Sequence, residues 1–87
     1  MDDEEREVAW LAMSDKAPVM DEAGDEIGRA EGLLGDPGDD IFHGIVVKLA
    51  RSGRKVEVRA DRIPKITTWR VYTDLAADEL ERLPEYR

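Results

Sequence analysis

The sequence predicts a mainly β protein: a small antiparallel β-barrel with a short C-terminal helix and a possible N-terminal helix. Five or six short segments rich in β-branched residues follow one another at intervals of about 8–12 residues. Each of these segments is bounded by a turn that contains Gly or Pro. The chain has 87 residues and no cysteine, so we expect one domain without a disulfide framework.

The acidic first segment, residues 1–16, has two possible structures. Residues 2–14 could form a short helix, because Val8 and Leu11 would share one face and the acids at positions 2–5 would complement the helix dipole. Trp10 lies off that face, so a strand from Trp10 to Met13 is the alternative. The sequence leaves this choice open.

The first β segment ends at Val19 and Met20, and a turn over residues 21–26 follows it. Asp21 is a typical turn residue, and Gly24 can adopt a positive φ. These features predict a hairpin that leads into a second strand.

The second strand is expected over residues 27–34, and Gly28 at its start is grouped with the structural turn residues Asp21, Gly24, Gly38 and Gly53. Small residues would share one of its faces in a period of two, namely Gly28, Ala30 and Gly32. They would permit sharp coiling and the close approach of a neighbouring strand, as a tight barrel requires. The strongest turn of the chain follows at residues 35–40, and it contains Gly38.

Residues 41–50 are dense in β-branched side chains on both faces, which predicts a central strand that is covered on both sides. Gly53 lies in the short turn that follows. Residues 55–61 then alternate polar and apolar side chains, so we expect one face in the core and one in water.

A last strand is expected over residues 66–73, after Pro64. Residues 74–83 predict a helix with apolar Leu75, Leu80 and Leu83 and an Asp78–Arg82 pair at i,i+4. The domain organisation is therefore an acidic N-terminal segment (1–16), a β domain (17–75) and a C-terminal helix and tail (76–87).

Four stretches of the chain resemble the PRC-barrel domain family. Residues 19–30 (VMDEAGDEIGRA) are similar to the family's opening hairpin, in which a V-x-D-x-x-G-x-x-I-G-x-V pattern is typical. Residues 44–47 (GIVV) and 56–63 (VEVRADRI) are similar to its central hairpin, and residues 71–86 (VYTDLAADELERLPEY) to the helix of many free-standing members. Three residues depart from the pattern: Ala30, Arg59 and Ala76.

The resemblance implies an interaction domain rather than an enzyme. PRC-barrel domains occur in the photosynthetic reaction-centre H subunit and in a ribosome-maturation factor, where the barrel is a docking surface. The family offers no catalytic residues that could be assigned to this chain. The function implied is a protein–protein docking module, and the alternative is an RNA- or ribosome-associated assembly factor.

Charge divides the chain into three parts, although its formal net charge is −8. Residues 1–47 carry 14 acids and three bases, residues 48–70 carry eight bases and two acids, and residues 71–87 are again acidic. A field of this overall sign repels nucleic acid. The division could serve contact with a second copy or a charged protein partner, although solvation of strand faces would also explain it.

Few residues could support catalysis or metal binding. His43 is the sole histidine, and its place after a turn predicts a surface position. Ser14 and Ser52 are not near it in sequence, so a nucleophilic triad is not expected. The carboxylates in the turns lack the spacing of a calcium-binding loop. We therefore expect no enzyme activity, no cofactor and no metal site.

The expected partner is a second copy of the chain or an unidentified protein. A homodimer would add buried area to a small domain. The candidate interface residues are apolar or aromatic side chains in two segments: Val8, Trp10, Leu11, Trp69, Val71 and Tyr72. No apolar run approaches the length of a membrane span, and the acidic start is unlike a signal peptide, so a cytoplasmic protein is expected.

Overall fold

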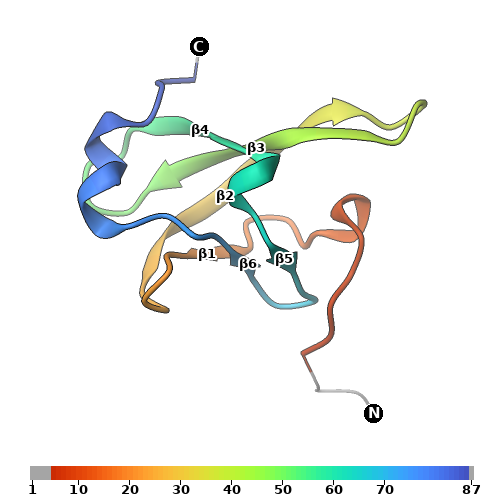
Figure 1. Cartoon of the computed structure of the whole chain (residues 1–87), viewed down its shortest axis with the longest axis horizontal. Coiled ribbons are helices and arrows are strands. Elements are labelled where there is room, and N and C mark those ends of the chain that lie inside the picture. Colours follow the sequence, from red (N-terminus) through yellow and green to blue (C-terminus); the bar gives the residue numbers. More distant parts are fainter. Residues whose placement is uncertain (1–4, 87) are drawn as a thin grey trace.

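The computed structural model describes residues 5–86 and is mainly β, as predicted (Figure 1). Six strands form one sheet, and the helical elements of these residues are short 3-10 turns. In chain order the elements are η1 (Trp10–Ala12), β1 (Pro18–Met20), β2 (Glu26–Asp36), β3 (Ile41–Leu49), β4 (Lys55–Arg59), η2 (Ala60–Arg62), β5 (Lys65–Ile66), β6 (Val71–Tyr72) and η3 (Ala77–Arg82). No helix within residues 5–86 has the length and apolar character needed to cross a membrane.

The sheet has the strand order β4-β3-β2-β1-β6-β5 and is open rather than closed into a barrel. Its neighbouring strands are antiparallel except β1 and β6, which run parallel with Val19 opposite Val71. The predicted all-antiparallel pairing is therefore wrong at one position. The two edge strands, β4 and β5, are consecutive in the chain and are joined through η2.

The C-terminal segment covers the outer edge of β4. The Glu57 amide donates a hydrogen bond to the Pro84 carbonyl over 2.9 Å, and the Tyr86 amide donates to the Lys55 carbonyl over 2.9 Å. An uncovered edge strand would present unpaired backbone groups to other chains. These two bonds occupy that edge.

The N-terminal segment does the same for the β5 end of the sheet. The Val8 amide donates to the Ile66 carbonyl over 2.8 Å, and the Thr68 amide donates to the Arg6 carbonyl over 2.8 Å. The two edges of the sheet are therefore both covered by segments close to the ends of the same chain.

The long β2–β3 hairpin is the largest feature of the fold, and its tip extends beyond the rest of the sheet (orange through yellow to green in Figure 1). A register shift between Ala30 and Gly32 interrupts it. Ala30 pairs with buried Val47, whereas Gly32 pairs with Val46, whose side chain lies outside the core cluster. The prediction that Gly28, Ala30 and Gly32 share one face is therefore wrong, because this bulge moves Gly32 to the other face.

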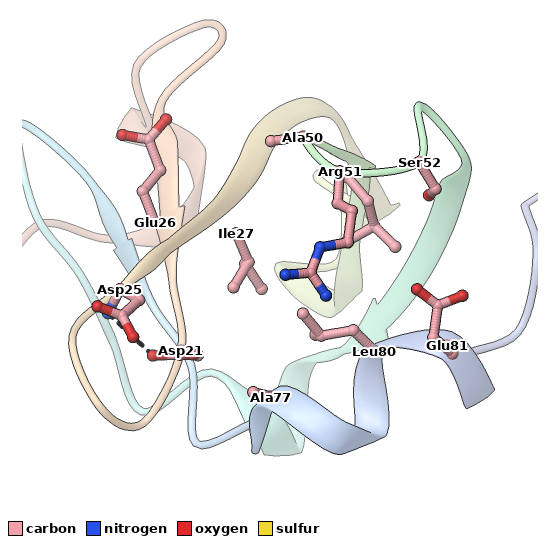
Figure 2. A pocket seen from close by; sticks show the side chains of 11 residues that line it. Asp21, Asp25, Glu26, Ile27, Ala50, Arg51, Ser52, Ala77, Leu80 and Glu81 are labelled. Atoms are coloured by element: carbon pink, nitrogen blue, oxygen red, sulfur yellow. Dashed lines mark hydrogen bonds between the residues drawn. The ribbon is translucent and has the colours of Figure 1, made fainter.

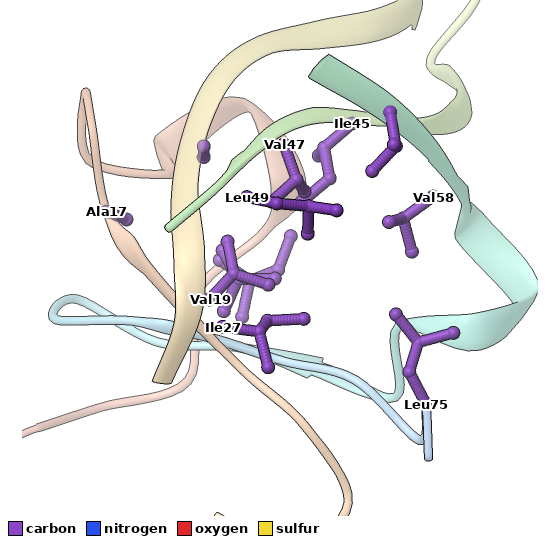
Figure 3. Packing of buried hydrophobic residues seen from close by; sticks show 12 residues of the cluster. Ala17, Val19, Ile27, Ile45, Val47, Leu49, Val58 and Leu75 are labelled. Atoms are coloured by element: carbon purple, nitrogen blue, oxygen red, sulfur yellow. The ribbon is translucent and has the colours of Figure 1, made fainter. Parts of the chain in front are cut away.

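The core lies between the β2–β3–β4 part of the sheet and the segments β1, β5, β6 and Leu75 (Figure 3). Its largest fully buried side chains are Ile45, Leu75, Val19, Val47, Val56, Val58 and Val71. Three consecutive residues of β3, from Ile45 to Val47, are buried, so the prediction of a strand covered on both faces is confirmed. The predicted alternation is also confirmed in β4, which ends at Arg59 rather than Asp61.

Residues 66–73 form a tight turn between two short strands rather than one strand. The Thr67 hydroxyl accepts hydrogen bonds from the amides of Trp69 (3.2 Å) and Arg70 (3.1 Å), which reverses the chain between β5 and β6. This turn has no Gly or Pro to signal it in the sequence.

The two predicted helices are not α-helices. Over residues 5–14 the structure has the single 3-10 turn η1 and an isolated bridge between Glu7 and Thr67, so both the helix and the strand expected there are wrong, while residues 2–4 lie outside the described residues. At the C-terminal end, η3 winds with three residues per turn, which favours contacts at i,i+3. Leu80 and Leu83 accordingly both pack against the core, whereas Asp78 and Arg82 form no ion pair.

Candidate interaction surfaces

The N-terminal part of the expected interface is largely used within the chain. The Trp10 ring stacks on Phe42 of β3 with ring centroids 5.0 Å apart, and its Nε1 donates to Asp40 Oδ1 over 3.1 Å. Val8 is half-buried against the core. Leu11 is 52% exposed, so it is the residue of this group that remains available to a partner.

The second part of the expected interface also contains both buried and exposed residues. Val71 is fully buried in the core and cannot contact a partner. Tyr72 is half-buried, and its hydroxyl donates to Glu5 over 2.9 Å. Trp69 is 45% exposed in the β5–β6 turn, with the Arg70 guanidinium 6.0 Å from its ring centroid.

The residues expected in structural turns occupy different settings. Asp21 Oδ1 accepts hydrogen bonds from the amides of Ala23 (3.0 Å) and Asp25 (2.9 Å) within the β1–β2 turn. Gly24 in the same turn has a φ of 87°, which a residue with a side chain rarely adopts.

Gly38 and Gly53 also lie in turns, and the Gly38 amide donates to Asp36 Oδ1 over 3.0 Å. Gly28 does not lie in a turn. It is inside β2, where a β-carbon would come within 2.2 Å of the Lys48 carbonyl oxygen.

Glu5 forms a polar cluster with the β5–β6 turn that no pattern in the sequence predicts. Its carboxylate accepts hydrogen bonds from the hydroxyls of Thr67 (2.5 Å) and Tyr72 (2.9 Å) and lies 3.3 Å from Arg70 Nε. The bond from Thr67 is the largest cause that lowers the pKa of Glu5, and burial partly opposes it. Burial, followed by the bond to Glu5, raises the pKa of Tyr72.

Arg62 joins η2 to the C-terminal segment through a second polar cluster. Its Nε lies 2.7 Å from Asp74 Oδ1, and its two terminal nitrogens donate to the Glu79 carboxylate over 3.1 and 2.9 Å. The hydrogen bond from Arg62, followed by that from the Ala76 amide, lowers the pKa of Glu79 to about 2. Ala76 precedes η3 and makes no side-chain cap, so this Glu79 bond is the polar contact at its start.

Half of the bases in the central basic stretch are paired with acids from the two flanking parts of the chain. These four of the eight bases in residues 48–70 are Arg54, Lys55, Arg62 and Arg70, whereas Arg59 pairs with Asp61 inside the stretch. Glu31 of β2, for example, lies 4.0 Å from Lys55 Nζ and 3.0 Å from Lys16 Nζ. Much of the charge division seen in the sequence is therefore used to hold the chain together.

Two exposed apolar side chains of the β2–β3 hairpin were not among the expected interface residues. Ile41 is 44% exposed and Leu33 is 37% exposed. Adjacent strand residues point to opposite faces, so the pair Leu33–Leu34 could have signalled that one of them lies outside the core. Leu33 and Ile41 both lie on the β2–β3 hairpin, against which Trp10 packs.

A pocket of about 460 Å³ lies where the β1–β2 turn, the β3–β4 turn and η3 meet (Figure 2). Ile27 and Leu80 contribute apolar surface to it, and the Arg51 side chain extends into it. The sequence could not predict this pocket, because its walls come from three segments that are far apart along the chain.

The residues considered for catalysis have structural or exposed positions. His43 is exposed on β3, as predicted. The Ser14 hydroxyl donates to the Thr68 carbonyl over 2.8 Å, and the Ser52 hydroxyl accepts from the Arg54 amide over 3.2 Å. Within residues 5–86, no group of three or more acidic or histidine side chains is placed to hold a metal ion.

Comparison with known proteins adds no assignment. No family model matches the chain, and no curated protein matches it.

Proposed function

We propose that this protein is a cytoplasmic, non-catalytic interaction module of the PRC-barrel type that assembles as a homodimer. The observation that carries the proposal is the exposure of Leu11, Leu33 and Ile41 on the two elements joined by the Trp10–Phe42 stack. Exposed apolar side chains on adjoining elements of a small protein are typical of a contact surface. The resemblance over residues 17–86 supports the same kind of function.

The covered sheet edges limit how such a contact can form. A partner strand cannot add to β4 or β5 without displacing a terminal segment, because both edges already carry hydrogen bonds. We place the contact on the β2–β3 hairpin and the adjacent η1 turn instead. The hairpin extends beyond the rest of the sheet in Figure 1.

A second copy is the occupant that the size of the protein favours. A chain of 87 residues buries a smaller fraction of its surface on folding than a larger domain does. A stable interface needs about 800 Å² from each partner. A two-fold dimer would cover the same apolar residues in both copies.

Sedimentation equilibrium at micromolar concentration tests this proposal. We expect a dimer for the wild type and a monomer for Ile41→Ser, with Leu33→Ser giving the same result. Trp69→Ser is the matched control, because Trp69 and Ile41 are almost equally exposed, at 45% and 44%. A wild-type monomer at high concentration would contradict the dimer, and dissociation by Trp69→Ser alone would move the interface to the β5–β6 turn.

The second candidate function is contact with RNA, and the surroundings of Trp69 favour it. Arg70 lies over the Trp69 ring, and Lys65 Nζ lies 4.8 Å from the centroid of the Tyr72 ring. Aromatic and cationic side chains together are typical of single-strand binding surfaces. An electrophoretic mobility assay at low salt would support this function if wild type shifts an RNA and Trp69→Ser does not, and unchanged mobility would exclude it.

A further inference from the structure

The pocket beside η3 combines an apolar floor with charges of both signs. Ile27 is 8% exposed and Leu49 is 3% exposed, and both line the pocket together with half-buried Leu80. Its volume, about 460 Å³, lies in the range of small-molecule sites. An apolar floor of this kind can cover a hydrocarbon side chain.

Two charged side chains of this pocket stay apart although their charges are opposite. Arg51 comes from the β3–β4 turn and Asp25 from the β1–β2 turn, and neither forms an ion pair within residues 5–86. The other pocket carboxylates have partners. Glu26 lies 3.2 Å from Arg29, and Glu81 lies 3.8 Å from Arg54.

The remaining pocket carboxylate, that of Asp21, is held by the turn. Its Oδ1 accepts two backbone hydrogen bonds and its side chain is almost fully buried. Arg51 and Asp25 are therefore the two pocket charges that a ligand could engage without breaking an existing contact. In Figure 2 the Arg51 guanidinium lies beside Leu80, and Ile27 lies between it and Asp25.

We propose that this pocket binds a small zwitterion with an apolar side chain, of the class of an aliphatic α-amino acid. The ligand carboxylate pairs with Arg51, whose planar guanidinium suits two parallel hydrogen bonds. The ligand ammonium pairs with Asp25, and the hydrocarbon side chain lies on Ile27 and Leu80. The proposal does not depend on the oligomeric state of the protein.

The charge of the pocket selects this class over simple ions. An organic anion without an ammonium group would be repelled by the four carboxylates that line the pocket. A cation without a carboxylate would leave Arg51 unpaired beside it. A ligand that carries both charges next to a hydrocarbon group satisfies all three parts of the site.

Amide chemical shifts measured by two-dimensional NMR during titration with L-leucine test the proposal. We expect saturable shifts at Ile27, Arg51 and Leu80. Three ligand fragments test the separate parts: leucinamide lacks the carboxylate, 4-methylpentanoate lacks the ammonium, and glycine lacks the side chain. Each should bind more weakly than leucine, because each leaves one part of the site without a partner.

Variants of the two charged residues complete the test. Arg51→Gln and Asp25→Asn should each weaken leucine binding about tenfold or more while leaving the other amide signals in place. Arg59→Gln is the matched control, since Arg59 is an exposed arginine of the neighbouring strand outside this pocket. The proposal is overturned if leucine causes no saturable shift, if a fragment binds as tightly as leucine, or if Arg51→Gln binds like the wild type.

Discussion

The indole ring of Trp10 stacks on the ring of Phe42, with centroids 5.0 Å apart and planes inclined by 21°. The contact joins η1 to the β2–β3 hairpin, and the indole Nε1 reaches Asp40 at the turn of that hairpin. Gly35 permits the approach, because a β-carbon there would lie 3.1 Å from the edge of the Trp10 ring. Trp10 therefore holds the N-terminal segment in place rather than projecting from it.

We predict that Trp10→Ala lowers the free energy of unfolding by about 2 kcal/mol, because it removes a stacked aromatic pair and one hydrogen bond. Trp10→Phe should lose less, since it keeps an aromatic ring against Phe42. Urea denaturation followed by circular dichroism measures both effects. Trp69→Ala serves as the control, because Trp69 is 45% exposed and has no ring stacked on it. Equal stability of Trp10→Ala and the wild type would contradict this role.

The Glu5 cluster predicts an acid-sensitive attachment of the N-terminal segment. The pKa of Glu5 is lowered from 4.5 in the folded protein, so its charged form stabilises the fold above that pH. The stabilisation is lost as pH falls through the folded-state pKa. Glu5→Gln should therefore be less stable than the wild type at pH 7, and the difference should narrow in acid.

The midpoint of urea denaturation at pH 7 and at roughly pH 3 measures this difference. Glu7→Gln is the control, since Glu7 is exposed and two residues away. If the difference in denaturation midpoint between Glu5→Gln and the wild type stays constant with pH, the carboxylate charge does not contribute to stability.

Two glycines of β2 should differ in how much the stability of the protein changes when each is replaced by alanine. A β-carbon at Gly28 would come within 2.2 Å of the Lys48 carbonyl oxygen, whereas at Gly32 it would meet no atom within 4 Å. We expect Gly28→Ala to cost at least about 2 kcal/mol, because the backbones of β2 and β3 must separate. Gly32→Ala should change stability by less than about 1 kcal/mol. Thermal unfolding measures the stability of both variants. An equal loss of stability in both would contradict the bulge at Glu31.

Local patterns predicted the parts of the fold that depend on local residues. The alternation in β4 and the apolar run in β3 are both visible in sequence, because each reflects the faces of a single strand. The bulge in β2 was missed, since a strict period of two in small residues gives no sign of an extra residue. The β5–β6 turn was missed because a Thr67 hydroxyl, rather than Gly or Pro, builds it.

The contacts between distant segments had no signal in the sequence. Val19 and Val71 are separated by more than half of the chain but lie opposite each other in parallel strands. No local pattern predicts this pairing. The cover of each sheet edge by a segment near a chain end depends on backbone groups, which every residue carries. The pocket could not be predicted from the sequence either, because Asp25, Arg51 and Leu80 come together only in the folded chain.

The Arg62 cluster predicts how the pKa of Glu79 responds to substitution. The bond from Arg62 is the largest cause that holds this pKa near 2, while the charge of Arg82 contributes least among the causes. Arg62→Gln should therefore raise the pKa of Glu79 toward 4.5, and Arg82→Gln should change it little. Carboxyl carbon shifts followed by NMR during an acid titration measure both values.

The same substitution should change the pH dependence of stability. In the wild type, Glu79 stabilises the fold above pH 4.5, and this contribution declines as pH falls toward 2. In Arg62→Gln the folded and unfolded pKa values of Glu79 approach each other, so its part of that decline disappears. If the variant kept the acid dependence of the wild type, Glu79 would not be linked to folding through Arg62, and the Ala76 amide would be the bond that attaches η3.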